Sequence, residues 1–164
     1  MAGEATRLGA EEVIRQLQLA PLEGEGGFFH QTWVSLARSG CPHPRGTVVL
    51  YLITPEKWSA LHRLRFDEDF HFYLGDSCEM VVAREGEGLR RVRLGPDLRA
   101  AEPVQHVVPA GWWQGTQLAP GGEWALLGIT MAPRFRPEAF VLATPSVLEE
   151  FSAGDRERLL PYLP

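Results

Sequence analysis

The feature that most constrains the fold is a succession of short β-rich runs between Phe28 and Thr130, each bounded by turn residues. The 17 glycines and 13 prolines are spread along the whole chain, so turns recur at short intervals. No helix-length pattern separates the runs, which argues against parallel strands with crossover helices. The order favours an all-β antiparallel fold, best fitted by a double-sheet jelly-roll β-barrel. We predict strands at Phe28–Val34, Thr47–Thr54, Ser59–Phe66, Phe70–Leu74, Glu79–Ala83, Leu89–Leu94, Val104–Val108, Trp113–Leu118 and Trp124–Thr130.

Helical patterns are confined to the two ends of the chain. Apolar residues recur at helical spacing between Val13 and Leu17, which predicts a short helix over residues 10–19 that Pro21 ends. Near the other end, a threonine followed by a proline is typical of a helix start, and we predict a tail of short helices over residues 144–164.

Length and charge restrict the kind of protein. A chain of 164 residues accommodates one domain with a real core, so we predict a single domain over residues 1–164 with its barrel at about 26–143. A net charge of −5 gives no electrostatic footprint for nucleic acid or an anionic membrane surface. We therefore expect a soluble small molecule as the partner.

Targeting signals and cysteine usage point to the cytoplasm. The amino terminus lacks a basic stretch followed by an apolar run, and no apolar stretch reaches the roughly 18 residues of a membrane span. Cys41 and Cys78 have neither the number nor the spacing of a disulfide scaffold or zinc site. We expect both to be free thiols in a reducing compartment.

His62 is the first polar residue that needs an explanation. The two-residue period of the predicted strand places Ala60, His62, Leu64 and Phe66 on one face, which is apolar enough to be interior. A buried polar group without a partner costs about 1–3 kcal/mol, so His62 requires a hydrogen bond or a metal. In isolation, a core histidine bonded to a backbone carbonyl is the simpler interpretation.

Glu68 lies in an acidic run that, by itself, is more typical of a solvated turn. If Glu68 points inward, alternation sends Phe70 inward and sends His71 and Tyr73 to the opposite face. A bulge at the turn would invert this parity, so both a site role and a packing role for His71 stay open.

Gln114 follows a Pro-Ala-Gly turn and shares a strand face with Trp112. Its amide can both donate to and accept from a ligand. Trp112 and Trp113, beside the expected barrel mouth, point to a hydrophobic ligand wall.

These segments together resemble the cupin superfamily, whose usual motifs are H-x-H-x3-E-x6-G and P-x-G-x2-H. The spacing from His62 through Glu68 to Gly75 is kept, whereas Leu64 and Gln114 stand where the motifs have histidines. More narrowly, the chain resembles the uncharacterised cupin-5 family in four stretches: EGEGGFFHQTW at 23–33, SALHRLRFDEDFHFYLGD at 59–76, LGPDL at 94–98 and VVPAGWWQG at 107–115. It departs from that family at His30 and Gln31, where members usually carry arginine and glutamate.

The resemblance implies a small jelly-roll barrel, commonly a homodimer, with a pocket lined by the two motif segments. Related cupins include sugar-nucleotide epimerases that work without metal, using a histidine base, a carboxylate partner and a tyrosine acid. By this resemblance the catalytic residues are His62, Glu68 and Tyr73, with Tyr51 as the alternative acid. The expected ligand-binding residues are Gln114, Trp112, His71, Phe70, Tyr51 and Glu25.

Three functions stay open. The first is a metal-independent epimerase or isomerase acting on a carbohydrate-like metabolite, with His62 as base. The second is a metabolite-binding protein without catalysis. The third is a metal-dependent oxygenase or isomerase with His62, Glu68 and His71 around a divalent ion. We expect no cofactor, because Leu64 and Gln114 disfavour the metal.

Overall fold

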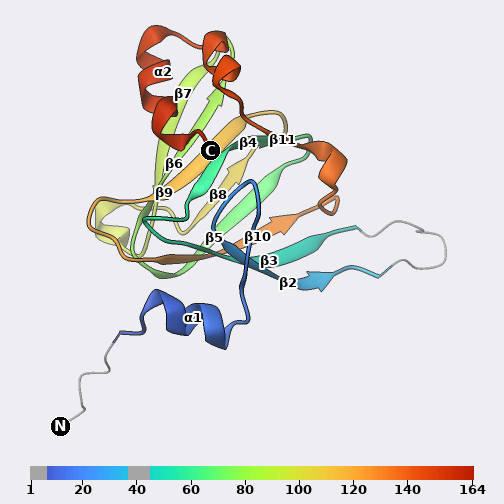
Figure 1. Cartoon of the computed structure of the whole chain (residues 1–164), viewed down its shortest axis with the longest axis vertical. Helices are drawn as coiled ribbons and strands as arrows, with labels where there is room; N and C mark the ends of the chain where they lie inside the picture. Colours follow the sequence, from blue (N-terminus) through green and yellow to red (C-terminus); the bar gives the residue numbers. More distant parts are fainter. Residues whose placement is uncertain (1–6, 37–44) are drawn as a thin grey trace.

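A computed structural model describes residues 7–36 and 45–164, and it contains two antiparallel sheets packed face to face (Figure 1). Within these residues the first sheet has the strand order β1 (Ala20–Pro21), β2 (Phe28–Val34), β3 (Thr47–Ile53), β10 (Ala125–Met131), β5 (Glu68–Gly75), β8 (Gln105–Val108). The second has the order β11 (Phe140–Leu142), β4 (Ser59–Leu64), β9 (Trp113–Leu118), β6 (Cys78–Arg84), β7 (Gly88–Leu94). The predicted antiparallel jelly roll is confirmed.

Helices cover parts of the outer faces of both sheets. Helix α1 (Ala10–Gln16) packs Val13 against Leu52 and Leu126 of the first sheet, below the strands in Figure 1. The C-terminal segment places Leu159 against the second sheet. That segment comprises η3 (Pro145–Glu150), α2 (Ala153–Leu159) and η4 (Leu160–Tyr162), while η1 (Leu98–Ala100) and η2 (Pro137–Ala139) are single turns in loops.

The main core lies between the sheets and follows the strand alternation. On β3, Tyr51 and Ile53 enter this core while Leu52 points to α1. On β9, Trp112 at the strand entrance belongs to the core between the sheets and Trp113 belongs to the cluster under the C-terminal helices. Both faces of the central strands are therefore buried, which explains their continuous apolar runs.

All of the predicted strands occur, with ends within two residues of the expected ones. The pattern missed β1 and β11, both of which are very short. The N-terminal helix ends at Gln16, and the next turn has Gln18 at φ +55°, a left-handed conformation that stops a helix before residue 19. Cys78 is a buried free thiol, whereas Cys41 lies outside the described residues.

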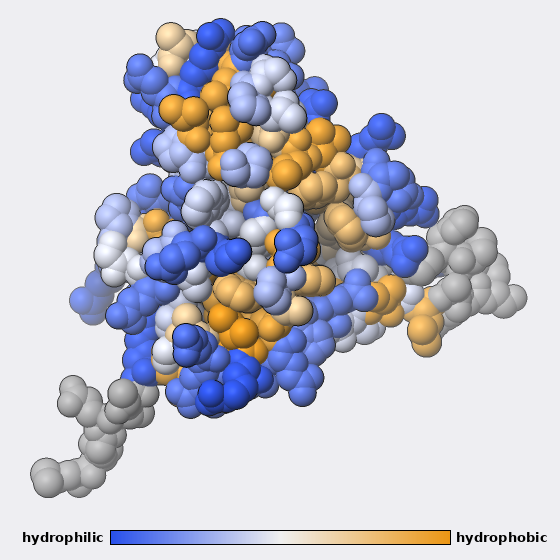
Figure 2. All heavy atoms as spheres, in the orientation of Figure 1, coloured by the Kyte–Doolittle hydropathy of each residue, from blue (hydrophilic) through white to orange (hydrophobic). Residues whose placement is uncertain are grey.

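In the part of the chain that the structure describes, no helix is long and apolar enough to cross a membrane. The surface seen in Figure 2 alternates between charged areas and smaller apolar areas, including apolar side chains beside the C-terminal helices.

Candidate functional site

A cavity of about 210 Å³ opens between the two sheets. Its volume is below the roughly 300–1,000 Å³ of pockets for drug-sized ligands, so it suits a small molecule. Most of its wall is apolar, formed by Leu22, Phe29, Val49, Tyr51, Leu64, Ile129, Met131, Phe135 and Phe140. Polar groups come from Glu23, Glu25, Gln31, Thr47 and Glu68. Among the described residues that line it there is no lysine, arginine or histidine.

The loop between β1 and β2 brings Glu25 to this cavity. Gly24, Gly26 and Gly27 around it all have positive φ, which side chains with a β-carbon rarely adopt. A β-carbon at Gly27 would lie 2.6 Å from the Tyr51 hydroxyl oxygen, and that hydroxyl donates a 2.9 Å hydrogen bond to the Gly26 carbonyl. Glycines are needed here because the loop passes directly over a core tyrosine.

Two further bonds hold Glu25 against β4. The Ala60 amide donates to the Glu25 carbonyl at 2.8 Å, and the Ser59 hydroxyl donates to Glu25 Oε1 at 3.0 Å. The position of this carboxylate is thus set by the start of β4 as well as by its own loop.

A bulge in β4 determines which side chains face the site. Ser59 pairs with Thr116 and His62 pairs with Gln114, so three steps along β4 correspond to two along β9. The bulge places Ser59 and His62 on one face. The strict alternation expected from the sequence, with Ala60 in phase with His62, is interrupted at this point.

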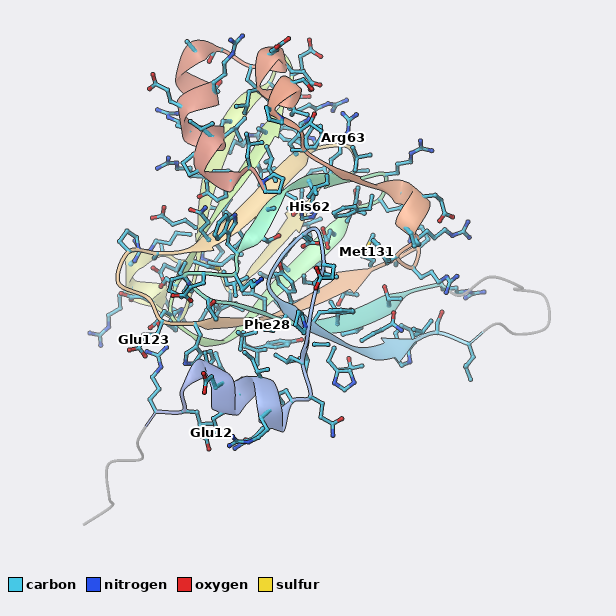
Figure 3. All side chains as sticks on the ribbon, viewed as in Figure 1. Glu12, Phe28, His62, Arg63, Glu123 and Met131 are labelled. Atoms are coloured by element: carbon cyan, nitrogen blue, oxygen red, sulfur yellow. The ribbon has the colours of Figure 1, made fainter. Side chains whose placement is uncertain are left out.

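His62 is held in one ring orientation. Its Nδ1–H donates to the Ala60 carbonyl at 2.8 Å, which leaves Nε2 facing the two cavity carboxylates. Nε2 lies 4.0 Å from Glu25 Oε1 and 3.8 Å from Glu68 Oε2. The His62 side chain is only 1% exposed and lies behind these carboxylates, on the strand seen beside the N-terminal loop in Figure 3.

Glu68 and Gln114 connect the two sheets at the floor of the cavity. The Gln114 amide nitrogen donates to Glu68 Oε2, so its oxygen must point away from that carboxylate. Among the described residues, Gln114 Oε1 and His62 Nε2 have no hydrogen-bond partner although both are buried. Buried polar atoms are normally paired, so these two atoms keep unused hydrogen-bonding capacity behind the cavity wall.

The charges of this cluster depend on one another. Burial lowers the pKa of His62, but the Glu25 and Glu68 carboxylates outweigh it and raise that pKa to about 9. Burial raises the pKa of the Glu25 carboxyl; the adjacent His62 opposes this and the nearby Glu68 adds to it. Burial, followed by the Glu25 charge, raises the pKa of Tyr51 well above its ordinary value. At neutral pH the imidazole is therefore a cation enclosed by carboxylates.

Phe140 forms a wall between the cavity and the histidine. Its ring stacks on His62 with centroids 5.1 Å apart, and Phe135 meets it edge-on at 6.4 Å. Phe140 begins β11 and pairs with Leu64, so the last strand closes the cavity on the side of the second sheet.

The structure brings together five of the residues expected from the sequence. Glu25, Tyr51 and Glu68 line the cavity, and His62 and Gln114 lie directly behind them. Phe70 and Trp112 are buried in the core between the sheets, outside the cavity wall.

Tyr73 and His71 lie away from the cavity, on the outer face of β5. His71 Nε2 is 3.4 Å from Asp69 Oδ2, and its ring stacks on Tyr73, which is 45% exposed and crosses Gly128. Because Glu68 and Phe70 are both buried, alternation holds through the first part of β5, and the register shift with β10 falls after Phe72, where it does not turn His71 inward. The expected grouping of Tyr73 with His62 and Glu68 is therefore not what the structure shows, and Tyr51 is the tyrosine beside Glu25.

Sequence reasoning missed several cavity residues. Glu23, Phe29 and Gln31 lie in the glycine-rich segment, where alternation along β2 sends Gln31 inward while His30 bonds to the Leu17 carbonyl at 2.8 Å. That alternation was readable from the sequence. Phe135 and Phe140 had no comparable signal, since they follow the last predicted strand.

A family model described as cupin superfamily (DUF985) matches residues 11–143, which include every strand of the described residues from β1 to β11. The chain belongs to this cupin family. A comparison with proteins of curated function gave no match.

Solved structures resemble this cupin along nearly its whole length. A hypothetical protein from Leishmania major is 26% identical, with a TM-score of 0.84 over 95% of this chain and 99% of that one. A protein from Shewanella oneidensis is 25% identical, with a TM-score of 0.87 over 96% and 99% of the two chains. A mutant of Bacillus subtilis oxalate decarboxylase is 14% identical, with a TM-score of 0.57 over 80% of this chain and 32% of that one, and it shows the fold alone.

Bacillus subtilis oxalate decarboxylase has Mn(II) centres, and such an ion needs several nitrogen and oxygen ligands around one point. Leu64 presents hydrocarbon to the cavity, and Gln114 turns its amide N–H to Glu68. Only His62 supplies a nitrogen, and no group of three His, Cys, Asp or Glu among the described residues has the geometry to hold a metal. The residues do not fit a resident metal of that type.

Proposed function

We propose that this cupin is a metal-independent epimerase or isomerase that transfers protons on a small carbonyl-bearing metabolite. The observation that supports this proposal most is the arrangement of two cavity-lining carboxylates around one buried imidazole, with Glu25 and Glu68 at 4.0 and 3.8 Å from His62 Nε2. Carboxyl groups held in unequal environments are suited to opposite roles in proton transfer.

In the proposed reaction Glu68 is the base and Glu25 is the acid. Glu68 takes a proton from a carbon next to the substrate carbonyl, and the electron pair of that C–H bond moves toward the carbonyl oxygen. Glu25, the carboxyl group of the pair whose pKa burial raises, takes up a proton in the reactive form of the site and donates it to that oxygen to give an enol. For an epimerisation the enol turns in the cavity, Glu68 delivers its proton to the opposite face of the same carbon, and the enol oxygen gives its proton back to Glu25 as the carbonyl re-forms. For an isomerisation of an enediol, Glu68 delivers its proton to the neighbouring carbon and the other hydroxyl gives its proton to Glu25 as the new carbonyl forms.

His62 then acts as a positioning residue. It lies behind the carboxylates and its side chain is 1% exposed, so its charge supports their arrangement without contact with the substrate. This role differs from the histidine base expected from the sequence. The polar floor fits part of a carbohydrate-like molecule, while the apolar wall favours a substrate with hydrocarbon on one side.

Deuterium incorporation tests the proposal without knowledge of the substrate. The protein is incubated with a small-molecule cell extract in D2O, and mass spectrometry identifies metabolites that gain one non-exchangeable deuterium. Wild type and Glu85→Gln, a change in the exposed turn between β6 and β7, should label the same metabolite. Glu68→Gln and Glu25→Gln should lower its labelling rate at least about 100-fold, as expected for loss of a general base or acid. Equal labelling by wild type and Glu68→Gln would exclude this mechanism.

A second candidate function is metabolite binding without reaction. It is favoured by the predominantly apolar wall and by the position of His62 and Gln114 behind it. Native mass spectrometry of freshly purified protein would then show a bound organic mass that gains no deuterium in the same assay.

A further inference from the structure

The carboxylates of the cavity wall restrict the charge of the ligand more strongly than the shape of the cavity restricts its size. Glu23, Glu25 and Glu68 contribute three carboxylates, and none of the other described lining residues is basic. The one cationic group at the floor, His62, is already enclosed by Glu25 and Glu68. An anionic ligand would meet these carboxylates without a basic partner in the wall, so phosphates and carboxylic acids are disfavoured.

Glu23 is the carboxylate that the proposed reaction leaves unused. It lines the cavity but is exposed, which places it at the solvent end, and it makes no side-chain hydrogen bond or ion pair with the described residues. Phe135 also lines the cavity and is 40% exposed, so an aromatic ring and a free carboxylate share the mouth. A carboxylate and an aromatic face are the groups that bind organic cations.

Two buried groups behind the floor are not fully paired within the described part of the protein. His62 Nε2 and Gln114 Oε1 are buried polar atoms without hydrogen-bond partners, and both belong to side chains that contact the cavity-lining carboxylates. The cavity therefore has a polar floor formed by Glu25 and Glu68, an apolar middle and an acidic mouth.

We infer that the cavity takes a small organic cation, a primary amine with an apolar body, whose ammonium group lies beside Glu23 at the mouth. Its hydrocarbon part packs against Phe29, Phe135 and Phe140, and its far end reaches Glu25 and Glu68. This inference rests on the proposed function where it makes the amine the substrate, because the far end must then carry the carbonyl group. The binding of the cation itself does not require any reaction.

Three probes of nearly equal shape and different charge test the inference: 2-phenylethylamine, 2-phenylethanol and phenylacetate. Their dissociation constants are measured at pH 7.5 by ligand-observed NMR titration. Wild type should bind the amine at least about tenfold more tightly than the alcohol and should bind phenylacetate most weakly. Higher salt should reduce the preference for the amine, because the mouth is exposed.

Glu23→Gln is the decisive variant, since it keeps the shape of an exposed side chain and removes its charge. It should lower the amine-to-alcohol affinity ratio at least about threefold and leave the affinity for the alcohol unchanged, while Glu85→Gln should alter neither. Four results would overturn the inference. In wild type these are no binding of the amine, equal binding of amine and alcohol, or tighter binding of phenylacetate than of the amine. In Glu23→Gln it is an unchanged amine-to-alcohol affinity ratio.

The deuterium assay separates this result from the proposed function. Amine selectivity without labelling of any metabolite would support the inference and leave metabolite binding as the function. Glu68-dependent labelling of an acidic metabolite by a protein without amine selectivity would keep the proposed reaction and refute the inference.

Discussion

His62 joins the two halves of the site because its ring touches groups that arrive from three separate parts of the chain. The Ala60 carbonyl fixes the orientation of its ring, and the carboxylates of Glu25 and Glu68 make its protonated form favourable despite burial. A buried cation of this kind is tolerated only while its counter-charges are present. A change at Glu25, at Glu68 or at the Ala60 carbonyl should therefore alter the pKa of His62.

The stability of the protein should fall as His62 loses its proton. A histidine whose folded pKa is raised from 6.5 to about 9 binds its proton more tightly in the folded state, so its contribution is complete below pH 6.5 and is lost as pH rises through 9. We expect wild type to lose roughly 1–3 kcal/mol of unfolding free energy over this range, measured by urea unfolding. His62→Gln should lack this loss, and His106→Gln, at a histidine whose pKa burial lowers, should retain it.

The effect of the Glu25 charge should be measurable as a change in the pKa of His62. After burial, its charge is the largest influence on the pKa of His62 and acts to raise it. In Glu25→Gln we expect the pKa of His62 to fall by at least about one unit, followed by NMR of labelled histidine. Glu56→Gln, a change in a nearby loop, should leave the pKa of His62 unchanged. An unchanged pKa of His62 in Glu25→Gln would show that Glu25 and His62 do not interact in solution.

At the level of elements, the β1–β2 loop depends on its glycines to different degrees. Gly24 and Gly26 have similar positive φ values, 84° and 98°, but a β-carbon at Gly24 would meet open space while one at Gly26 would clash with the Trp58 carbonyl. Gly24→Ala should therefore cost about 1–2 kcal/mol for backbone strain alone. Gly26→Ala should cost at least about 1 kcal/mol more, because the clash adds to the strain. Thermal unfolding of the two variants makes this comparison, and equal losses would show that the contact with Trp58 is unimportant.

Elements with a strong two-residue period could be predicted from the sequence, and the irregular ones could not. The runs that became β2 and β9 match the structure at both ends. The β4 bulge had no sequence signal, since it results from pairing with β9 and from the bond between Ala60 and Glu25. Strand β11 was missed because three residues are too few to show a period, yet it supplies Phe140.

At the level of the whole molecule, we propose that the expected homodimer forms through the outer face of the first sheet. Tyr73, Val107 and Trp33 on this face are 45%, 45% and 51% exposed, and α1 covers only the Leu52 and Leu126 region. Light scattering after size exclusion should give a dimer for wild type and a monomer for the double variant Tyr73→Glu, Val107→Glu. Leu98→Glu, at an exposed leucine in η1, should stay dimeric; a monomeric wild type would refute the expectation.

The frame of the site was predictable from the chain, but its chemistry was only partly so. The spacing of His62, Glu68 and Gln114 indicated that they converge, and they do. The resemblance to metal-free epimerases offered Tyr73 or Tyr51 as the acid, whereas strand alternation predicted Tyr73 on the opposite face, and the structure has it there. How deeply each side chain lies below the cavity wall could not be predicted either. Only the packed structure shows that the carboxylates, and not the imidazole of His62, face the cavity.

Because the Ala60 amide donates to the Glu25 carbonyl, hydrogen exchange at this one amide reports on opening of the β1–β2 loop. Its neighbour Ser59 bonds to the same glutamate, so the loop cannot lift from β4 without exposing that amide to solvent. The exchange rate of a single proton thus records how often the acidic loop opens, in the resting protein and with no ligand known.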